Sequence, residues 1–563
     1  MKSIKDVLKS RCGFAVISNL ITLLVSVFLF RPFWEESDDI GIALIAEGAY
    51  GYHEPHLIYS NIIYGKILCF FSGIIPSIRW HAVFEYIFTF FALTVFVYLI
   101  SKDKKGRMLA LILEAASFYE VYVALQFSKI ATFVAILSYF ILFEITGSDM
   151  SKKQKGLIAS AAVLFACYAE ILRLESFLLA TMIAGCYGIC LVVYEFIKGE
   201  LTGRIRSYLA CFIPVFVMVA VLFAVDRYAY SDGEWKDYIV YQDAASQMVD
   251  YHNSALLYDQ HVDALNELGI SENDALMYIT YQTLEARVTT VPLMKQICLI
   301  DPKGMGSIDM DLIKAWVANI YDELFDMNSM ITGFLMIAGI FLASAFNSRD
   351  RRLWFFNAII QALLVLGILF YYQYSGRWCH RIVFALLVAE FVLIIYMLNN
   401  MDIPDTGAAL KISVIIMIGV SVLYLRLGNE FAYQENKRSG NDYGQIVSYM
   451  QENSDRLFVT DVFTMSDYGR YNIFRAARFG QFQNCLQTDS VLMSNSPINR
   501  SIAGKFGYID QLDALSSRSA DVILVDALSP EVELTFCNEH GDGGEYHLNK
   551  IDTVGGVDLY NIL

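Results

Sequence analysis

The sequence lacks the cysteine and histidine spacings that mark structural zinc sites and disulfide frameworks. Its ten cysteines are spread over 563 residues without a Cys-x-x-Cys pair, and its eight histidines form no His-Glu-x-x-His motif. Glycine-rich phosphate loops of the Walker type and Gly-x-Ser-x-Gly elbows are absent as well. These absences argue against ATP-driven transport and against a hydrolase built on a serine elbow.

Charged residues are scarce, and positive charge is the scarcer kind. Only 18% of the residues are charged, where a soluble domain has about 25%. The chain has 42 Lys and Arg against 58 Asp and Glu, which gives a formal net charge of −16. A basic surface for nucleic acid is therefore not expected.

What the sequence has in abundance is long apolar runs. It is 56% hydrophobic, and its mean hydropathy is +0.45. About eleven runs are long enough to cross a bilayer core as helices. They lie at 12–32, 81–100, 107–124, 128–146, 156–173, 176–197, 207–225, 328–346, 353–373, 380–398 and 410–427. The sequence thus predicts an α-helical polytopic membrane protein.

Lysine and arginine clusters predict the orientation of these spans. Basic residues precede the first span and follow the second, fourth, sixth and eighth, which places every cluster on one side. By the positive-inside rule that side is cytoplasmic, with the N-terminus there and the C-terminus outside. A further apolar stretch at 62–75 would reverse this pattern if it spanned, so we expect an interfacial helix there.

Three hydrophilic segments are then expected outside the cytoplasm, at about 33–80, 227–326 and 429–563. The second should be helical, with a helix starting at Ser271. In the third, β-rich runs at 456–461, 520–526 and 557–563 predict an α/β domain. We therefore expect a membrane domain at 1–428 and an extracytoplasmic α/β domain at 429–563.

Four carboxylates directly follow the first span, in the segment Glu35-Glu36-Ser37-Asp38-Asp39. Charges are costly near lipid and are often functional where they gather at a membrane face, although a solvated helix end has the same appearance. A carboxylate at this place could accept a proton from an attacking hydroxyl. The candidates for such a base are Asp38 and Asp39.

The order of these features resembles the GT-C superfamily of membrane glycosyltransferases. The acidic pair Asp38-Asp39 follows the first span, and the His/Pro/Tyr-containing segment 52–59 comes next. Arg79 then precedes the second span, and Arg173 ends a later one. Many members have His-Pro-Pro-Leu-Tyr where this chain has Glu-Pro-His-Leu-Ile-Tyr.

The resemblance implies transfer of a sugar from a polyprenyl-phosphate donor to a glycan, lipid or protein acceptor outside the cytoplasm. It slightly prefers Asp39 over Asp38 as the base. It also implies substrate-binding roles for His53, His56 and Tyr59. The lipid bilayer and the donor are the expected partners, and a bacterial cell membrane is the expected location.

A lipid phosphate that leaves at membrane depth needs cations, and Arg can bind phosphate through two parallel hydrogen bonds. The candidates are Arg173, Arg377 and Arg381; the last two lie four residues apart, with His380 beside them as a further substrate-binding candidate. An alternative is that these arginines make structural ion pairs, such as Arg173 with Glu175 or Glu170.

A metal cofactor stays open at this point. Asp38, Asp39, His53, His56 and Asp243 could supply ligands to Mg²⁺ or Mn²⁺, but no metal motif is present. Two other functions also stay open: a polysaccharide polymerase or ligase, and a flippase for lipid-linked glycans. A flippase would be expected to show repeated halves and charges in mid-span, and the sequence has no internal repeat.

Overall fold

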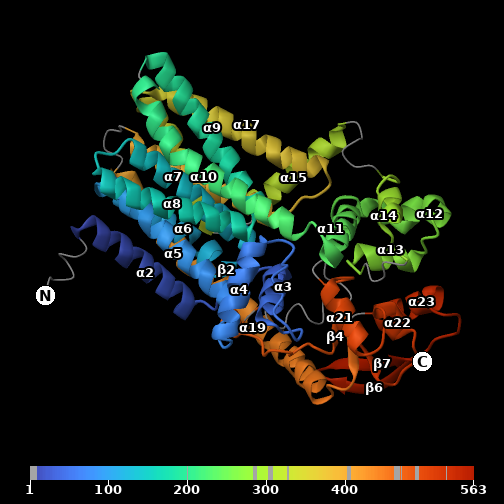
Figure 1. Cartoon of the computed structure of the whole chain (residues 1–563). Helices are drawn as coiled ribbons and strands as arrows, with labels where there is room; N and C mark the ends of the chain where they lie inside the picture. Colours follow the sequence, from blue (N-terminus) through green and yellow to red (C-terminus); the bar gives the residue numbers. More distant parts are fainter. Residues whose placement is uncertain are drawn as a thin grey trace.

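The computed structural model of the chain describes residues 9–199, 201–282, 288–301, 308–325, 329–401, 407–461, 470, 472–487, 493–527 and 529–563. A slanted bundle of long helices occupies one part of the molecule, and a smaller sheet-containing domain carries the C-terminus (Figure 1). A group of shorter helices, coloured green in Figure 1, lies beside the sheet-containing domain.

Within the described residues, nine helices are long and apolar enough to cross a membrane. The expected multi-pass membrane protein is therefore confirmed. The elements that carry these spans are α2 (Arg11–Leu29), α5 (Trp80–Ile100), α7 (Phe127–Thr146), α8 (Lys152–Leu172), α9 (Leu174–Lys198), α10 (Leu201–Ala229), α16 (Ser329–Asn347), α17 (Arg351–Tyr374) and α18 (His380–Asn400).

The other two expected spans are also helical, but they are not among the nine. Helix α6 (Lys104–Tyr122) begins with a basic turn and carries Glu114 and Glu120 farther along. Helix α19 (Gly407–Glu452) is apolar at Leu410–Val420 and continues through the expected domain boundary at 428 as one helix of 46 residues.

Helices α7 and α18 form the centre of the bundle, where nearly all their side chains are buried. Helix α7 packs against α5, α8, α9 and α18. Helices α2 and α10 are apolar but mostly exposed, as expected for helices whose outer faces contact lipid.

The chain between α2 and α5 forms a compact cap on one end of the bundle. Strand β1 (Phe33–Trp34) pairs in parallel with β2 (Ala124–Leu125), which directly precedes α7. Helix α3 (Ser37–Glu47) follows β1, and α4 (Ile62–Ile74) is the short helix expected at 62–75. The β1–β2 pair therefore fixes the start of α3 beside the start of α7.

The segment after α10 is helical, as predicted, and α13 begins with a capping box between Ser271 and Asp274. Its elements are α11 (Gly233–Ser246), the π-helical turn η1 (Gln247–Tyr251), the 3₁₀ turn η2 (Asn253–Leu256), α12 (Tyr258–Glu267), α13 (Glu272–Ile279), α14 (Val291–Ile297) and α15 (Met310–Phe325).

The predicted α/β domain is also present. Its five-stranded sheet has the order β4-β3-β5-β7-β6, with β3 parallel to β4 and β5 and with β7 antiparallel to β5 and β6. Its elements are β3 (Leu457–Thr460), β4 (Cys485–Gln487), α21 (Pro497–Lys505), α22 (Gln511–Leu515), β5 (Val522–Val525), α23 (Pro530–His540), β6 (Leu548–Val554) and β7 (Val557–Ile562).

This domain contacts the end of α3. Helix α3 ends at Gly48 in a left-handed turn (φ 78°), and Gly480 N–H donates to Gly48 O at 2.9 Å. A Cβ at Gly48 would lie only 2.8 Å from the Phe479 ring, so glycine permits both the turn and the approach. The α/β domain and the acidic helix are therefore packed together.

Candidate functional site

Asp38 and Asp39 lie in the first turn of α3 and point into different surroundings. The Asp39 side chain is fully buried; it accepts a hydrogen bond from Phe127 N–H at 3.1 Å and lies 3.0 Å from His81 Nε2. The Asp38 side chain is 23% exposed and pairs with Arg381 Nη1 at 2.9 Å. Successive helical residues diverge by about 100°, which explains the separation.

The two surroundings have different electrostatic consequences. Burial raises the pKa of Asp39, and the hydrogen bond and charge of His81 oppose this rise only in part. Asp39 thus has no route to a substrate and a weakened tendency to be charged. Asp38 instead faces a cation at a surface that a substrate can reach.

The three candidate arginines line one cavity of about 550 Å³. Arg173 lies at the one-residue break between α8 and α9, Arg377 in the loop before α18, and Arg381 in the first turn of α18. Away from the arginines the cavity has apolar walls from α9, α17 and α18. The apolar residues that line it are Leu179, Met182, Leu363, Leu364, Gly367, Ile368, Ile382 and Ala385.

Each arginine has an acidic partner. Arg173 Nε lies 3.0 Å from Glu175 Oε2, and Arg377 Nη2 lies 3.0 Å from Asp250 Oδ2. The ion pair between Arg173 and Glu175 is the alternative considered from the sequence. Each arginine side chain is nevertheless 19–21% exposed, so the guanidinium groups are open to an incoming anion.

The histidine candidates lie elsewhere. His53 Nδ1 lies 2.8 Å from Ala46 O, and its ring is beside Phe479 of the α/β domain. His56 bonds Glu54 at 2.5 Å and stacks on Trp235. Neither histidine lines the arginine cavity.

His380 pairs with Glu323 of α15 at 2.7 Å and also does not line the arginine cavity. The ring of Tyr59 lies under Arg173, 5.0 Å from its guanidinium carbon. Of the four substrate-binding candidates, only Tyr59 therefore contacts one of the three arginines.

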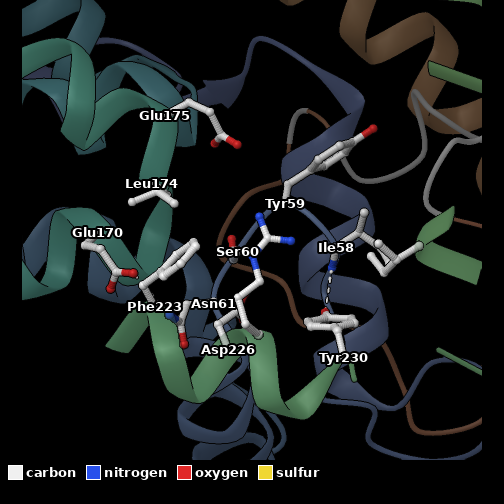
Figure 2. A pocket seen from close by; sticks show the side chains of 12 residues that line it. Ile58, Tyr59, Ser60, Asn61, Glu170, Leu174, Glu175, Phe223, Asp226 and Tyr230 are labelled. Carbon is white, nitrogen blue, oxygen red and sulfur yellow. Dashed lines mark hydrogen bonds between the residues drawn. The ribbon is translucent and has the colours of Figure 1, made fainter. Parts of the chain in front are cut away.

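A second, smaller cavity of about 120 Å³ adjoins the first, and Glu175 lines both. Figure 2 shows Tyr59 and Glu175 at its upper side and Glu170, Asn61 and Asp226 around its lower side. Asn61 Nδ2 donates to Glu170 Oε1 at 3.2 Å, and Asp226 accepts from Ile62 N–H at 2.8 Å. Three carboxylates and one cation, Arg227, line this chamber, whereas three arginines and one carboxylate, Glu175, line the larger cavity.

Sequence reasoning missed two groups of residues. Asp250 and Tyr251, which contact Arg377, lie in the π-helical turn of a segment that had no motif. His81 and Glu85, four residues apart at the start of a predicted span, surround Asp39. Ionisable residues inside a predicted span were a signal that could have found the second group.

The metal candidates from the sequence are not brought together. Within the described residues, two groups of three side chains could hold an ion: Asp39 with His81 and Glu85, and Asp274 with Glu539 and His540. Asp38, His53, His56 and Asp243 belong to neither group.

Comparisons with known proteins give a likeness in overall structure alone. No family model and no curated protein matches the chain. The solved structure of ArnT from Cupriavidus metallidurans bound to undecaprenyl phosphate covers 97% of both chains at 11% identity, with a TM-score of 0.43. Its apo form matches over the same share with a TM-score of 0.38. At this identity and TM-score the two matches carry no argument about the reaction.

Proposed function

We propose that the protein is a membrane glycosyltransferase that moves a sugar from a polyprenyl-phosphate donor to an acceptor outside the cytoplasm. The observation that carries the proposal is the arginine cavity, because a cationic rim and an apolar groove meet there and the Asp38 carboxylate pairs with Arg381 of that rim. We place the N-terminus in the cytoplasm, the α/β domain outside it, and the protein in a bacterial cell membrane.

The cavity suits a donor with a charged head and a hydrocarbon chain. Arg173, Arg377 and Arg381 would bind the phosphate, and the apolar walls of α9 and α17 would receive the first isoprenoid units. A phosphate becomes more negative as it leaves the sugar. Preorganised guanidinium groups at this place would therefore stabilise the transition state more than the bound donor.

Asp38 is our choice for the general base. As an acceptor oxygen attacks the anomeric carbon, its proton would pass to Asp38, the new C–O bond would form, and the C–O bond to phosphate would break. Polyprenyl phosphate would then leave with the bonding pair. The ion pair with Arg381 supports this role, since a donor phosphate that takes Arg381 would release Asp38 for the acceptor.

The test measures release of polyprenyl phosphate from a panel of radiolabelled polyprenyl-phosphate sugars by the purified protein in lipid nanodiscs, with cell-envelope extract as acceptor. Asp38→Asn should lower kcat about 10²–10⁴-fold, the usual contribution of a general base. Asp237→Asn, which changes an exposed acid on α11, should leave turnover unchanged.

Full activity of Asp38→Asn would refute the assignment of the base. Turnover of oligosaccharide-bearing donors alone would point instead to a polymerase or ligase. No turnover of any donor, together with movement of lipid-linked glycan across the bilayer, would point to a flippase.

A further inference from the structure

Three buried side chains converge at the contact between α3 and α5. Asp39 Oδ1 lies 3.0 Å from His81 Nε2, and Glu85 Oε1 lies 4.0 Å from the same nitrogen. One ligand atom from each residue lies within 4.8 Å of the others, and all three side chains are at most 1% exposed. His81 and Glu85 share one face of α5 because they are four residues apart.

Each of the three side chains is also held by a partner outside the group. Tyr64 OH lies 2.7 Å from His81 Nδ1, Trp34 Nε1 donates to Glu85 Oε2 at 3.2 Å, and Phe127 N–H donates to Asp39. Outer partners of this kind fix the tautomer and direction of metal ligands. Here they direct His81 Nε2, Glu85 Oε1 and Asp39 Oδ1 at one another, and Asp39 Oδ1 also accepts from Phe127 N–H.

The group has an unmet electrostatic need. Glu85 Oε1 is buried and has no hydrogen-bond partner, and no arginine or lysine pairs with either acid in the part of the chain that the structure describes. Two carboxylates in a dry site repel each other when both are charged, so without a counter-ion at least one of them must hold a proton. A dication would neutralise both at once.

We propose that Asp39, His81 and Glu85 bind one divalent transition-metal ion of the zinc class. Ligands about 2.0–2.1 Å from a tetrahedral ion lie about 3.3–3.4 Å apart, and the observed spacings of 3.0 and 4.0 Å lie on either side of this value. The imidazole nitrogen favours Zn²⁺, Mn²⁺ or Fe²⁺ over Mg²⁺ and Ca²⁺, which prefer oxygen ligands.

The ion would link α3 to α5 and hold Asp38, the residue before Asp39 on α3, directed at Arg381. Asp39 would then be a metal ligand and a positioning residue for Asp38. The metal site itself does not depend on the proposed reaction, because its geometry and its charge are independent of any substrate.

The test is the metal content of the purified full-length protein in nanodiscs, measured by inductively coupled plasma mass spectrometry after exposure to Zn²⁺ and gel filtration. Wild type should hold one equivalent more than Glu85→Gln and His81→Gln. Glu114→Gln, which changes another buried acid of the bundle, should keep the ion. His540→Gln should keep it too, which separates this site from the group at Asp274.

A second measurement covers the case in which the variants fail to fold. Wild type stripped with a chelator and loaded with Co²⁺ should show the visible absorption bands of a nitrogen- and oxygen-ligated tetrahedral site, without thiolate charge-transfer bands. Loss of the ion only in the triad variants, or this spectrum in wild type, supports the site. Two results would overturn the metal site: equal metal content in wild type and Glu85→Gln, or a stripped wild type that takes up no Zn²⁺, Mn²⁺, Fe²⁺ or Co²⁺. The two acids would then be explained by a proton shared between them.

Discussion

Two adjacent residues of α3 belong to two different regions of the molecule. Asp38 is partly exposed and pairs with Arg381, 343 positions away on the rim of the arginine cavity, whereas Asp39 lies in a buried cluster with His81 and Glu85. The difference shows that the role of an acidic pair is set by what each side chain meets after folding. In the cavity, charge is available to a substrate; in the cluster, charge must be neutralised inside the protein.

After the loss of Asp38 itself, the largest expected effect comes from removing the cation that faces it. Arg381→Ala should lower kcat/KM for a polyprenyl-phosphate sugar about 10²–10³-fold, because it removes a preorganised donor to the leaving phosphate. Arg381→Lys should recover part of the loss, since it restores the charge without the bidentate geometry. Steady-state turnover in nanodiscs measures both. If Arg381→Ala stays within twofold of wild type, the cavity is not the donor site.

The next prediction separates the two acids by the property that each controls. Asp39→Asn should lower the free energy of unfolding by about 1–3 kcal/mol. The amide oxygen is a weaker acceptor than a carboxylate oxygen for Phe127 N–H and His81, and the amide brings two further donors into the buried cluster. Asp38→Asn should cost less than about 1 kcal/mol, as its ion pair is partly exposed. Thermal unfolding of the two variants provides the comparison. Equal losses would mean that the two regions do not differ as described.

A third prediction tests the apolar half of the cavity. Gly367 lines it, and a Cβ there would meet no atom within 4 Å, so Gly367→Phe should place a ring in the groove. KM for a long-chain donor should rise about tenfold, equivalent to about 1.4 kcal/mol, while a donor with one or two isoprenoid units should be less affected. Gly339→Phe on α16, where the space is equally open, is the matched control. The groove assignment fails if both glycine variants change KM equally.

Much of the fold could be predicted because its signals are local. Apolar runs of bilayer length gave the helices, and β-rich runs ending at Asp461 and Asp526 gave strands β3 and β5. The pairing of β1 with β2 was missed, because two-residue strands have no sequence period. Helix α6 shows a related limit. Its carboxylates, Glu114 and Glu120, are buried by neighbouring helices, and the sequence of α6 alone does not show this.

The site divides in a similar way. The three arginines were found as unusual charges at the ends of apolar runs, and they meet in one cavity. Glu175 could be named as a partner of Arg173, but the partners of Arg377 and Arg381 could not be found, since Asp250 and Asp38 are brought to them only by tertiary packing. His81 and Glu85 stand out as ionisable residues in a predicted span, but nothing in the sequence connects them to Asp39. Sequence reasoning could name Asp38 and Asp39 together, but a choice between them needed the direction in which α3 presents each one.

The smallest expected effect is a dependence of stability on pH that the metal would reverse. Burial raises the pKa of Asp39 above its unfolded value, so the metal-free folded protein binds more protons than the unfolded chain just above pH 4. Its stability should therefore fall as pH rises through the folded pKa of Asp39, and Asp39→Asn should flatten this part of the curve. With Zn²⁺ bound, the sign of this pH dependence should change, because protons compete with the ion for the same three ligands and stability then rises with pH.

Thermal unfolding of chelated and Zn²⁺-loaded protein between pH 4 and 7 measures both slopes. Parallel curves for the two forms would show that no ion binds the cluster of Asp39, His81 and Glu85. The contrast between Asp38 and Asp39 would still hold.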